Sequence, residues 1–200
     1  MYALVEDGNI TKFFAYPKGF VLNDNQYPAD VFTKWSNEER EAIGIYEVIT
    51  DSTNKKDEQY YINTNEQFTF ADGQVTRSWG TATAKQLEDR NATDENGVEL
   101  NPVVVIKGLK SQKKDIIKQQ ASGLLEQTDW YNHKALDDDT YTIPDNIKTY
   151  RANVRAKSNE METQIDACTT VDELKALYEY TEQEDGSITR PLAEFPTLEI

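Results

Sequence analysis

Side chains that commonly perform catalysis or bind metals are scarce in this sequence and lie far apart. The chain has one histidine, His133, and one cysteine, Cys168, among its 200 residues. A lone histidine cannot build a histidine-based zinc site or a histidine-dependent triad without partners, so we expect His133 on a loop or on the surface. Cys168 follows the last apolar position of a helical stripe, which favours a small buried hydrophobic side chain over a nucleophile.

The densest acidic run, Asp137–Asp139, has oxygen ligands of the kind that calcium prefers. It lacks the spaced Asp or Asn, the glycine and the terminal glutamate of a calcium-binding loop, so we expect a solvated loop. The glycine-rich phosphate-binding patterns, HExxH and GxSxG are absent from the sequence. We therefore expect no catalytic residues, no metal, no cofactor and no enzymatic activity. The alternative is a hydrolase that uses scattered carboxylates.

The net charge of −15 argues against a nucleic-acid partner, because phosphate binding needs a basic surface. No apolar run approaches the ~20 residues needed to span a bilayer, and the N-terminus lacks the basic flank of a signal peptide. We expect no membrane partner and a protein made in the cytoplasm of a host cell. Five lysines fall on one helical stretch, where we expect a solvated face rather than an anion site: Lys107, Lys110, Lys113, Lys114 and Lys118.

The elements that position these residues centre on two amphipathic helices between Leu109 and about Ala167. Apolar residues recur at helical spacing over 109–125. Over 144–167 an apolar stripe steps by three, four, seven and four residues, through Ile147, Tyr150, Val154, Met161 and Ile165. Pro144 suits a first helical position, and the charge of Asp145 suits the helix dipole there. The pattern predicts a long antiparallel helical hairpin with a short polar connection.

The two ends of this connection carry a recognisable pattern: Leu124–Trp130 reads LLEQTDW, and Thr149–Arg155 reads TYRANVR. It resembles the C-terminal segment of phage tail assembly chaperone and tail fibre assembly proteins. In that family a helix ending in a leucine pair runs into Thr-Asp-Trp, and a later helix carries Tyr-Arg and a second arginine. The resemblance covers about 60 of the 200 residues. The matching positions are Leu124, Leu125, Thr128, Asp129, Trp130, Tyr150, Arg151 and Arg155.

The opening of the chain, MYALVEDGNITKFFAYPKGF and then WSNEEREAIGIYEV, also resembles the start of small marine-phage structural proteins. Together the resemblances imply a bacteriophage virion structural protein of the tail or tail fibre that acts by protein–protein contact. Its partners would be other tail or fibre proteins, and it would join the virion tail after assembly in the host cytoplasm. The alternative is a non-virion assembly chaperone for tail or fibre proteins.

Trp130 has two interpretations. We expect it to fill the core between the two helices of the hairpin; the alternative is an anchor for a partner, since Trp and Arg dominate interface hot spots. Arg151 and Arg155 stand one helical turn apart, where they could pair with Asp129 or Glu126 across the hairpin.

The N-terminal half predicts a β-rich domain over 1–80. Asp7-Gly8 and Asp72-Gly73 each separate two strand-like runs, as in tight hairpins. Ser36 and Glu39 fit a capping box that opens a short helix. We expect a linker over 81–102, with a short helix near 83–90 and a turn at 95–97.

The predicted fold class is α+β: the hairpin-rich N-terminal part, a helical domain over 103–180 and an extended tail over 181–200. A third short helix begins at Thr170, which forms a capping box with Glu173. In the tail, Leu192, Phe195 and Leu198 are apolar anchors that pack on their own domain or dock onto a neighbour. We expect a homo-oligomer, formed through this tail and the part of the stripe that the shorter helix leaves uncovered.

Overall fold

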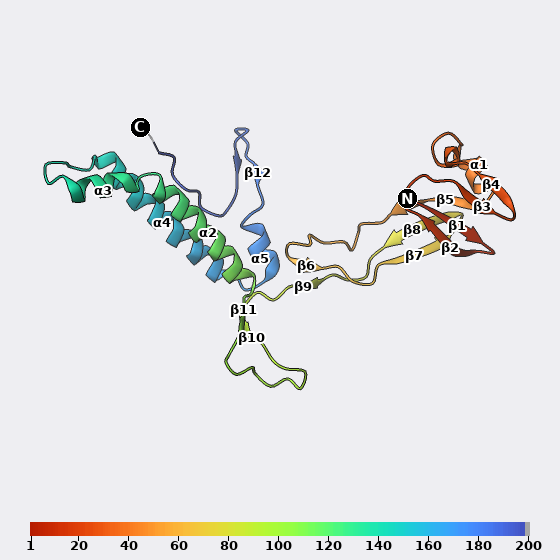
Figure 1. Cartoon of the computed structure of the whole chain (residues 1–200), viewed down its shortest axis with the longest axis horizontal. Coiled ribbons are helices and arrows are strands. Elements are labelled where there is room, and N and C mark those ends of the chain that lie inside the picture. Colours follow the sequence, from red (N-terminus) through yellow and green to blue (C-terminus); the bar gives the residue numbers. More distant parts are fainter. Residues whose placement is uncertain (199–200) are drawn as a thin grey trace. The chain divides into compact units, whose positions relative to one another are not determined.

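The computed structural model describes residues 1–198 and divides into two compact units, Met1–Thr83 and Ala84–Ile200. The fold is α+β, as the sequence predicts: strands form most of the first unit and helices dominate the second (Figure 1). The boundary at Thr83 comes slightly later than the predicted end of the β-rich domain. Residues 81–102 are not a plain linker, because short strands form within them.

A curled five-stranded sheet in the order β2-β1-β5-β8-β7 forms the first unit. Its strands are β1 (Tyr2–Glu6), β2 (Asn9–Phe14), β5 (Ile45–Thr50), β7 (Gln67–Ala71) and β8 (Gln74–Ser78). Both predicted hairpins form, and both Asp-Gly turns have the positive φ that such tight turns require. β5 and β8 run parallel, whereas the other neighbouring strands are antiparallel. The rings of Phe13 and Phe68, on the two edge strands, lie 4.5 Å apart.

The first unit also contains several short elements. They are β3 (Phe20–Leu22), β4 (Asn25–Tyr27), the 3-10 helix η1 (Ala29–Phe32), α1 (Asn37–Glu41), β6 (Tyr61–Ile62) and β9 (Thr83–Ala84). The predicted capping box is present at the start of α1. The core gathers aromatic and aliphatic side chains from β1, β2, β3, η1 and β5: Leu4, Phe14, Phe20, Val31, Phe32 and Ile45.

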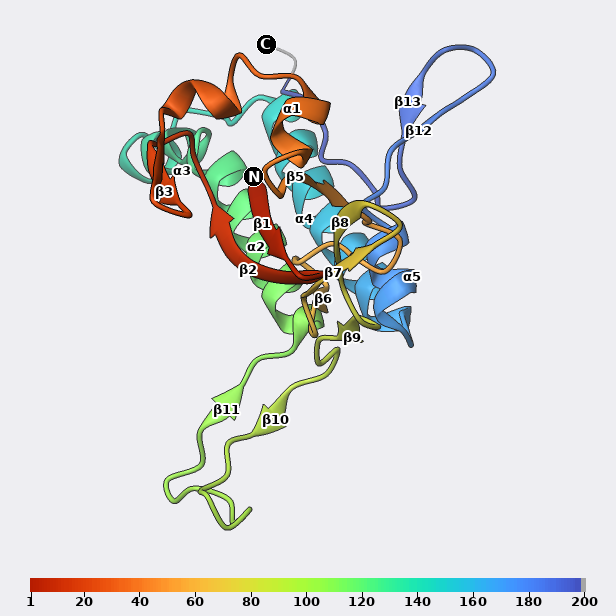
Figure 2. The same cartoon turned by 90° about the vertical axis from the view of Figure 1, so that its right-hand side faces the viewer.

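The second unit is organised around α2 (Leu109–Glu126) and α4 (Asp145–Ala167), which run antiparallel and side by side (Figures 1 and 2). Every residue of the predicted α4 stripe is buried. The connection between the helices is not a simple polar loop, because it contains the additional helix α3 (Asp129–Asp137). α5 (Val171–Ala176) begins with the predicted capping box at Thr170.

The lysines of α2 do not form a plain solvated face, because Lys110 and Lys113 are buried. Lys110 Nζ bonds the Glu88 carboxylate and donates to the Asp166 carbonyl at 3.1 Å. Further along α2, Lys114 and Lys118 reach acids of α4, Asp166 at 2.7 Å and Glu162 at 3.2 Å. Lys113 lies over the Tyr178 ring, 4.7 Å from its centroid. These long side chains bury their aliphatic parts, while their ammonium groups contact acids or an aromatic ring. The spacing of residues within α2 cannot reveal these partners, because they lie on other segments.

A two-stranded arm precedes α2, where the sequence predicts the linker and its short helix. It pairs β10 (Arg90–Asn91) with β11 (Val105–Ile106), and the predicted turn lies at its tip with Gly97 at positive φ. Residues 86–89 cap α2 instead of forming a helix: the Gln86 carbonyl accepts from Leu109 N at 2.9 Å, and the Leu87 carbonyl accepts from Lys110 N at 3.1 Å. The carbonyl groups of Gln86 and Leu87 therefore bond to the first turn of α2, and they are not available for a helix over residues 83–90.

Asp89 completes the cap of α2. Its carboxylate accepts hydrogen bonds from Gly108 N at 2.7 Å and from Ser111 Oγ at 2.9 Å. A Cβ on residue 108 would collide with the carbonyl groups of Leu87 and Glu88, so glycine is required by close approach of the two backbones. The root of the arm is thus fixed to the start of α2.

The tail packs on its own unit. After the hairpin of β12 (Thr181–Glu182) and β13 (Ile188–Thr189), Leu192 is buried and its N–H donates to the Leu177 carbonyl at 3.0 Å. Phe195 and Leu198 pack against Ala121, Tyr150 and Val154. The predicted exposure of part of the α4 stripe is therefore wrong, because neighbouring segments of the same chain cover it. Of the two alternatives for the tail anchors, the structure shows packing on their own domain. Residues 199 and 200 of the predicted tail lie outside the described residues.

Truncation of the α4 stripe should be costly. Ile165 is fully buried, and Ile165→Ala should lower the free energy of unfolding by about 2–5 kcal/mol through lost burial and a residual cavity. Ile116 on α2 is 48% exposed, so Ile116→Ala should cost less than about 1 kcal/mol. Urea unfolding followed by far-ultraviolet circular dichroism measures both. Equal losses in the two variants would contradict the packing described.

The cap at Asp89 should respond to pH. The hydrogen bond from Gly108 N, and then that from Ser111, lower the pKa of Asp89 below its ordinary 3.8. Because the folded pKa is depressed, the cap's contribution to stability is complete above the ordinary pKa and is lost as pH falls through the folded pKa. The Gly108 amide resonance should titrate with a midpoint below 3.8, and Asp89→Asn should abolish that titration. A midpoint at or above the ordinary value would show that the cap is not formed.

Candidate functional site

The best-defined polar cluster of the second unit lies where α2 ends and α3 begins. Thr128 is completely buried there. Both its backbone N–H, at 3.0 Å, and its Oγ1, at 2.9 Å, donate to the Leu125 carbonyl. The carbonyls in the last turn of a helix have no partners within the helix. Thr128 therefore supplies two donors to one of them and folds the chain tightly over the end of α2.

Arg151 of α4 ties this turn to the opposite helix. Its guanidinium donates to the Leu125 carbonyl at 2.7 Å and to Thr128 Oγ1 at 2.6 Å. It also forms an ion pair with Asp129, with Nη2 and Oδ1 2.8 Å apart. Only 11% of the Arg151 side chain is exposed. One planar group with fixed donor directions thus joins α2, α3 and α4 through hydrogen bonds to a charged donor, which are stronger than neutral ones.

Trp130 does not fill the core between the helices, and that prediction is wrong. It is 52% exposed, and its ring lies 3.8 Å from the ring of Tyr131. The space it was expected to fill holds Ala121, Tyr150 and Val154, with Leu124, Leu125, Phe195 and Leu198 packed around them. Because Thr128 and Asp129 face Arg151, the next side chain on α3 points away from the cluster.

α3 lacks the usual burial of a short helix: none of its nine residues is buried. Isolated helices of this length are marginal in water, so most short helices rely on tertiary packing. Leu136 is 79% exposed, and His133 is exposed too, as predicted, although it lies on a helix. We call the side chains of Trp130 and Leu136, which are exposed, and of Tyr131, which is partly exposed, the α3 surface.

Lys134 and the acidic loop flank the α3 surface with charge. Lys134 Nζ lies over the Tyr141 ring, 4.2 Å from its centroid. Asp137–Asp139 are exposed, as predicted for a solvated loop. Hydrogen bonds from the side chain and backbone of Thr140 lower the pKa of Asp138, so this carboxylate is charged at neutral pH. An apolar surface beside negative charge favours a partner with an apolar pocket and basic groups near it.

The structure places the other predicted site residues in different surroundings. Thr128, Asp129 and Arg151 form the polar cluster, and Arg151 pairs with Asp129 as the sequence allowed. Leu124, Leu125, Tyr150 and Phe195 belong to one apolar core, while Leu192 is buried beside α5. Arg155 is exposed, and its Nη1 donates to the Arg151 carbonyl at 3.3 Å rather than crossing the hairpin.

Sequence reasoning missed Tyr131, Leu136 and α3 itself. Their only signal was the apolar spacing of Trp130, Tyr131 and Leu136 within a segment taken as a polar connection. It also missed the burial of Lys110 and Lys113. Cys168 is buried, as expected, and burial raises the pKa of its thiol.

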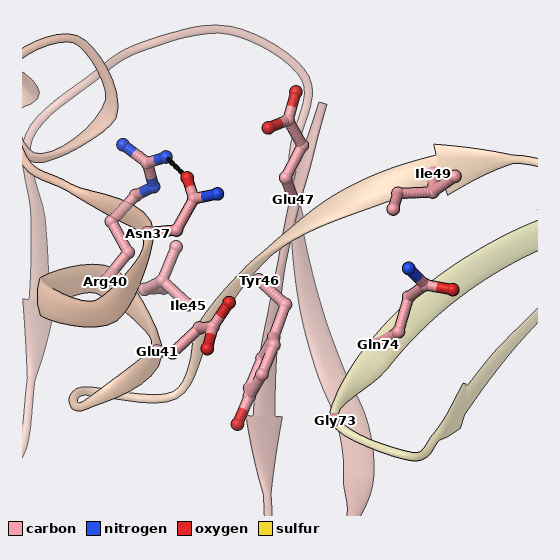
Figure 3. A pocket seen from close by; sticks show the side chains of 9 residues that line it. All are labelled: Asn37, Arg40, Glu41, Ile45, Tyr46, Glu47, Ile49, Gly73 and Gln74. Atoms are coloured by element: carbon pink, nitrogen blue, oxygen red, sulfur yellow. Dashed lines mark hydrogen bonds between the residues drawn. The ribbon is translucent and has the colours of Figure 1, made fainter.

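A shallow pocket in the N-terminal unit offers a different kind of concave surface (Figure 3). Its one cationic group is already used: Arg40 is buried, donates to the Trp35 carbonyl at 2.6 Å and to Asn37, and lies 5.1 Å from the Tyr2 ring centroid. The carboxylates of Glu41 and Glu47 lie apart in Figure 3. The lining residues are Asn37, Arg40, Glu41, Ile45, Tyr46, Glu47, Ile49, Gly73 and Gln74.

Comparison of the chain with protein-family models, with curated proteins and with solved structures finds no match in any of the three. Over residues 1–198 no cluster of three or more His, Cys, Asp or Glu side chains could hold a metal ion. Within the same described range, none of the helices has both the length and the apolar character needed to cross a membrane.

Replacing Arg151 should loosen the end of the hairpin. Arg151→Ala leaves Thr128 Oγ1, the Leu125 carbonyl and Asp129 without their shared donor, and should lower the free energy of unfolding by about 1–3 kcal/mol. Arg151→Lys should lie between wild type and alanine, because an ammonium cannot reproduce the planar fork. The matched control is the exposed Arg155→Ala, expected within about 0.5 kcal/mol of wild type. Thermal and urea unfolding measure all three; a loss in Arg155→Ala as large as in Arg151→Ala would contradict the assignment.

Proposed function

We propose that this chain is a structural component of a bacteriophage particle, in the tail or tail fibre, and that it binds a neighbouring particle protein through the α3 surface. The observation that carries the proposal is a half-exposed tryptophan on a helix with no buried residue, next to a turn that the mostly buried side chain of Arg151 holds in place. The proposed activity is contact rather than catalysis.

Trp130 has the physical properties of an interface anchor. A tryptophan left half in water loses much of the hydrophobic free energy that its large ring could contribute. Interface hot spots are rich in tryptophan, tyrosine and arginine. Trp130 and Tyr131 present two neighbouring, tilted rings together, and Leu136 adds a strongly exposed aliphatic side chain. A partner that covers these side chains would also supply the packing that α3 lacks within its own chain.

The polar cluster makes the α3 surface ready to bind. The contacts from Arg151 to Thr128 and Asp129 fix the first turn of α3 before any partner arrives. Ordering of a binding segment in advance reduces the entropy that association must overcome. Thr128, Asp129 and Arg151 are also positions of the resemblance to phage tail assembly proteins. A need to orient Trp130 gives a physical reason for these residue types to occur together, and this supports the phage proposal.

Particle composition tests the proposal directly. In particles purified from a culture that produces this chain, quantitative mass spectrometry should find it at a fixed copy number relative to the tail proteins. A chain present in the lysate but missing from the particles would replace the virion role with that of an assembly chaperone. A chain that associates with no tail or fibre protein in either fraction would contradict both roles.

Trp130→Ala tests the surface. Because Trp130 is not a core side chain, the variant should keep its fold and lose less than about 1 kcal/mol of stability, while its incorporation into particles falls about tenfold or more, as for an interface hot spot. Tyr16→Ala is the matched control, since Tyr16 is an exposed aromatic residue of the other unit. Equal incorporation of the two variants would rule out the α3 surface as the contact.

A further inference from the structure

The last described part of the chain lies over the two long helices as a strap. Residues 190–198, which we call the strap, run along α2 and α4 from α5 toward the α3 end (Figure 1). Three apolar side chains recur at every third residue, a spacing that places them on one face of an extended chain with three residues per turn: Leu192, Phe195 and Leu198. Glu194 and Thr197 between them are exposed. The strap therefore presents an apolar face to the helices and a polar face to water.

One side chain of α4 fixes the start of the strap. Gln164 Nε2 donates to the Pro191 carbonyl at 3.0 Å, and Gln164 Oε1 accepts from Ala193 N at 2.9 Å. A side-chain amide carries both donors and an acceptor, so it can bond the backbone of an extended segment at two residues. Gln164 thus sets the register in which the strap follows α4, and with it the places that Phe195 and Leu198 reach.

The end of the strap completes the apolar core next to Arg151. Phe195 and Leu198 pack against a cluster of three buried side chains: Ala121, Tyr150 and Val154. Leu125 packs against the same cluster. Tyr150 immediately precedes Arg151 on α4. The strap and the polar cluster at the start of α3 therefore share one set of supporting side chains.

Leu125 belongs both to this apolar core and to the polar cluster. Its carbonyl accepts from Thr128 N at 3.0 Å, from Thr128 Oγ1 at 2.9 Å and from Arg151 Nη1 at 2.7 Å. A carbonyl oxygen has two lone pairs, and hydrogen bonds weaken steeply as their geometry departs from the optimum. Three donors on one oxygen therefore require Leu125 to stay in place. Because its side chain rests on the core that the strap completes, the position of its carbonyl depends on the strap.

The strap can open while the helices stay paired. All of residues 181–189 before it are exposed, and β12 and β13 pair over only two residues each. Segments with few buried contacts open locally at a lower free energy than the whole fold. α2 and α4 also have ion pairs of their own, Lys114 with Asp166 and Lys118 with Glu162. Seated and open states of the strap are therefore compatible with the same helix pair.

We propose that the strap positions the α3 surface. While the strap is seated, Leu125 and Arg151 hold the turn at Thr128 from which α3 begins; when the strap opens, this turn loosens. Phe195 and Leu198 are thus positioning residues that act through Leu125. The inference rests on the proposed role of the α3 surface as the contact. Because coupling between two sites is reciprocal, a partner that covers the α3 surface should also tighten the strap.

Hydrogen exchange of the Thr128 amide in the free chain tests the coupling. In Phe195→Ala this amide should exchange about five- to thirtyfold faster, because its acceptor is no longer held in place. Phe195→Leu keeps most of the packing volume and should restore most of the protection. The control is Ile188→Ala, in the exposed hairpin before the strap, where Ile188 is 69% exposed. Its Thr128 exchange should stay within about twofold of wild type.

Two further variants separate positioning from a general loss of stability. Leu109 is buried at the other end of α2. Leu109→Ala should lower the urea midpoint of unfolding while Thr128 exchange stays unchanged, because that amide exchanges through opening of the strap. Arg151→Ala should in turn speed exchange of the Ala193 amide in the strap. In the double variant with Phe195→Ala, Thr128 should exchange no faster than in Arg151→Ala alone, since the two substitutions break one coupled unit. Far-ultraviolet circular dichroism checks that each variant folds.

Two results would overturn the proposal. One is equal Thr128 exchange in Phe195→Ala and Ile188→Ala. The other is an acceleration in Leu109→Ala as large as in Phe195→Ala, because the strap would then contribute only to overall stability. Either result would leave the contact at α3 standing, which Trp130→Ala tests in particles. Conversely, unchanged incorporation of Trp130→Ala would remove the contact while the coupling measured in the free chain remained.

Discussion

The order of the helical unit at the α3 end depends on one guanidinium group. The last turn of α2 leaves carbonyls without helical partners, and the chain must then reverse into α3 and return along α4. Arg151 meets these requirements together, because its donors reach the Leu125 carbonyl, Thr128 Oγ1 and Asp129 at once. Because Asp129 faces Arg151, the side chain of the next residue, Trp130, points outward. The proposed contact surface is therefore a consequence of how the hairpin is closed.

Charged side chains also join the helices in the rest of the unit. The chain is strongly acidic as a whole, yet the lysines of α2 lie against acids of α4 and the aromatic ring of Tyr178. The helix pair thus combines a buried apolar stripe with a row of cross-helix ion pairs, and the pairs that remain solvated contribute modestly. The arm is the exception, since its apolar run carries no charge. Acidic surfaces keep copies of the chain apart.

Local patterns were sufficient to predict much of the fold. Asp-Gly turns fix the two hairpins of the sheet, capping boxes mark the starts of α1 and α5, and the apolar stripe locates α4 to within a residue at its start. Each of these signals depends on residues a few positions apart. The parallel pairing of β5 with β8 and the cap that residues 86–89 give to α2 depend on distant residues and leave no local pattern.

The candidate site was predicted less well, for the same reason. The residues of the polar cluster were identified, and the Arg151–Asp129 pair was anticipated. The position of Trp130 was wrong because Phe195 and Leu198, about 65 residues further along the chain, help to fill the space between the helices. The part of the arm up to residue 102 was taken for a linker, and its apolar run, Val103–Ile106, was placed in the helical domain. Composition cannot show that this run remains uncovered.

Hydrogen exchange of the chain inside purified particles, compared with the free chain, measures the contact at α3 most directly. In the free chain the amides of Asp129–Asp137 should exchange quickly, since no side chain of this helix is buried. Inside the particle the same amides should become strongly protected, while those of the already buried α4 stripe change little. An α3 that exchanges equally fast in both states, with new protection only in other segments, would contradict the assignment of the α3 surface as the contact.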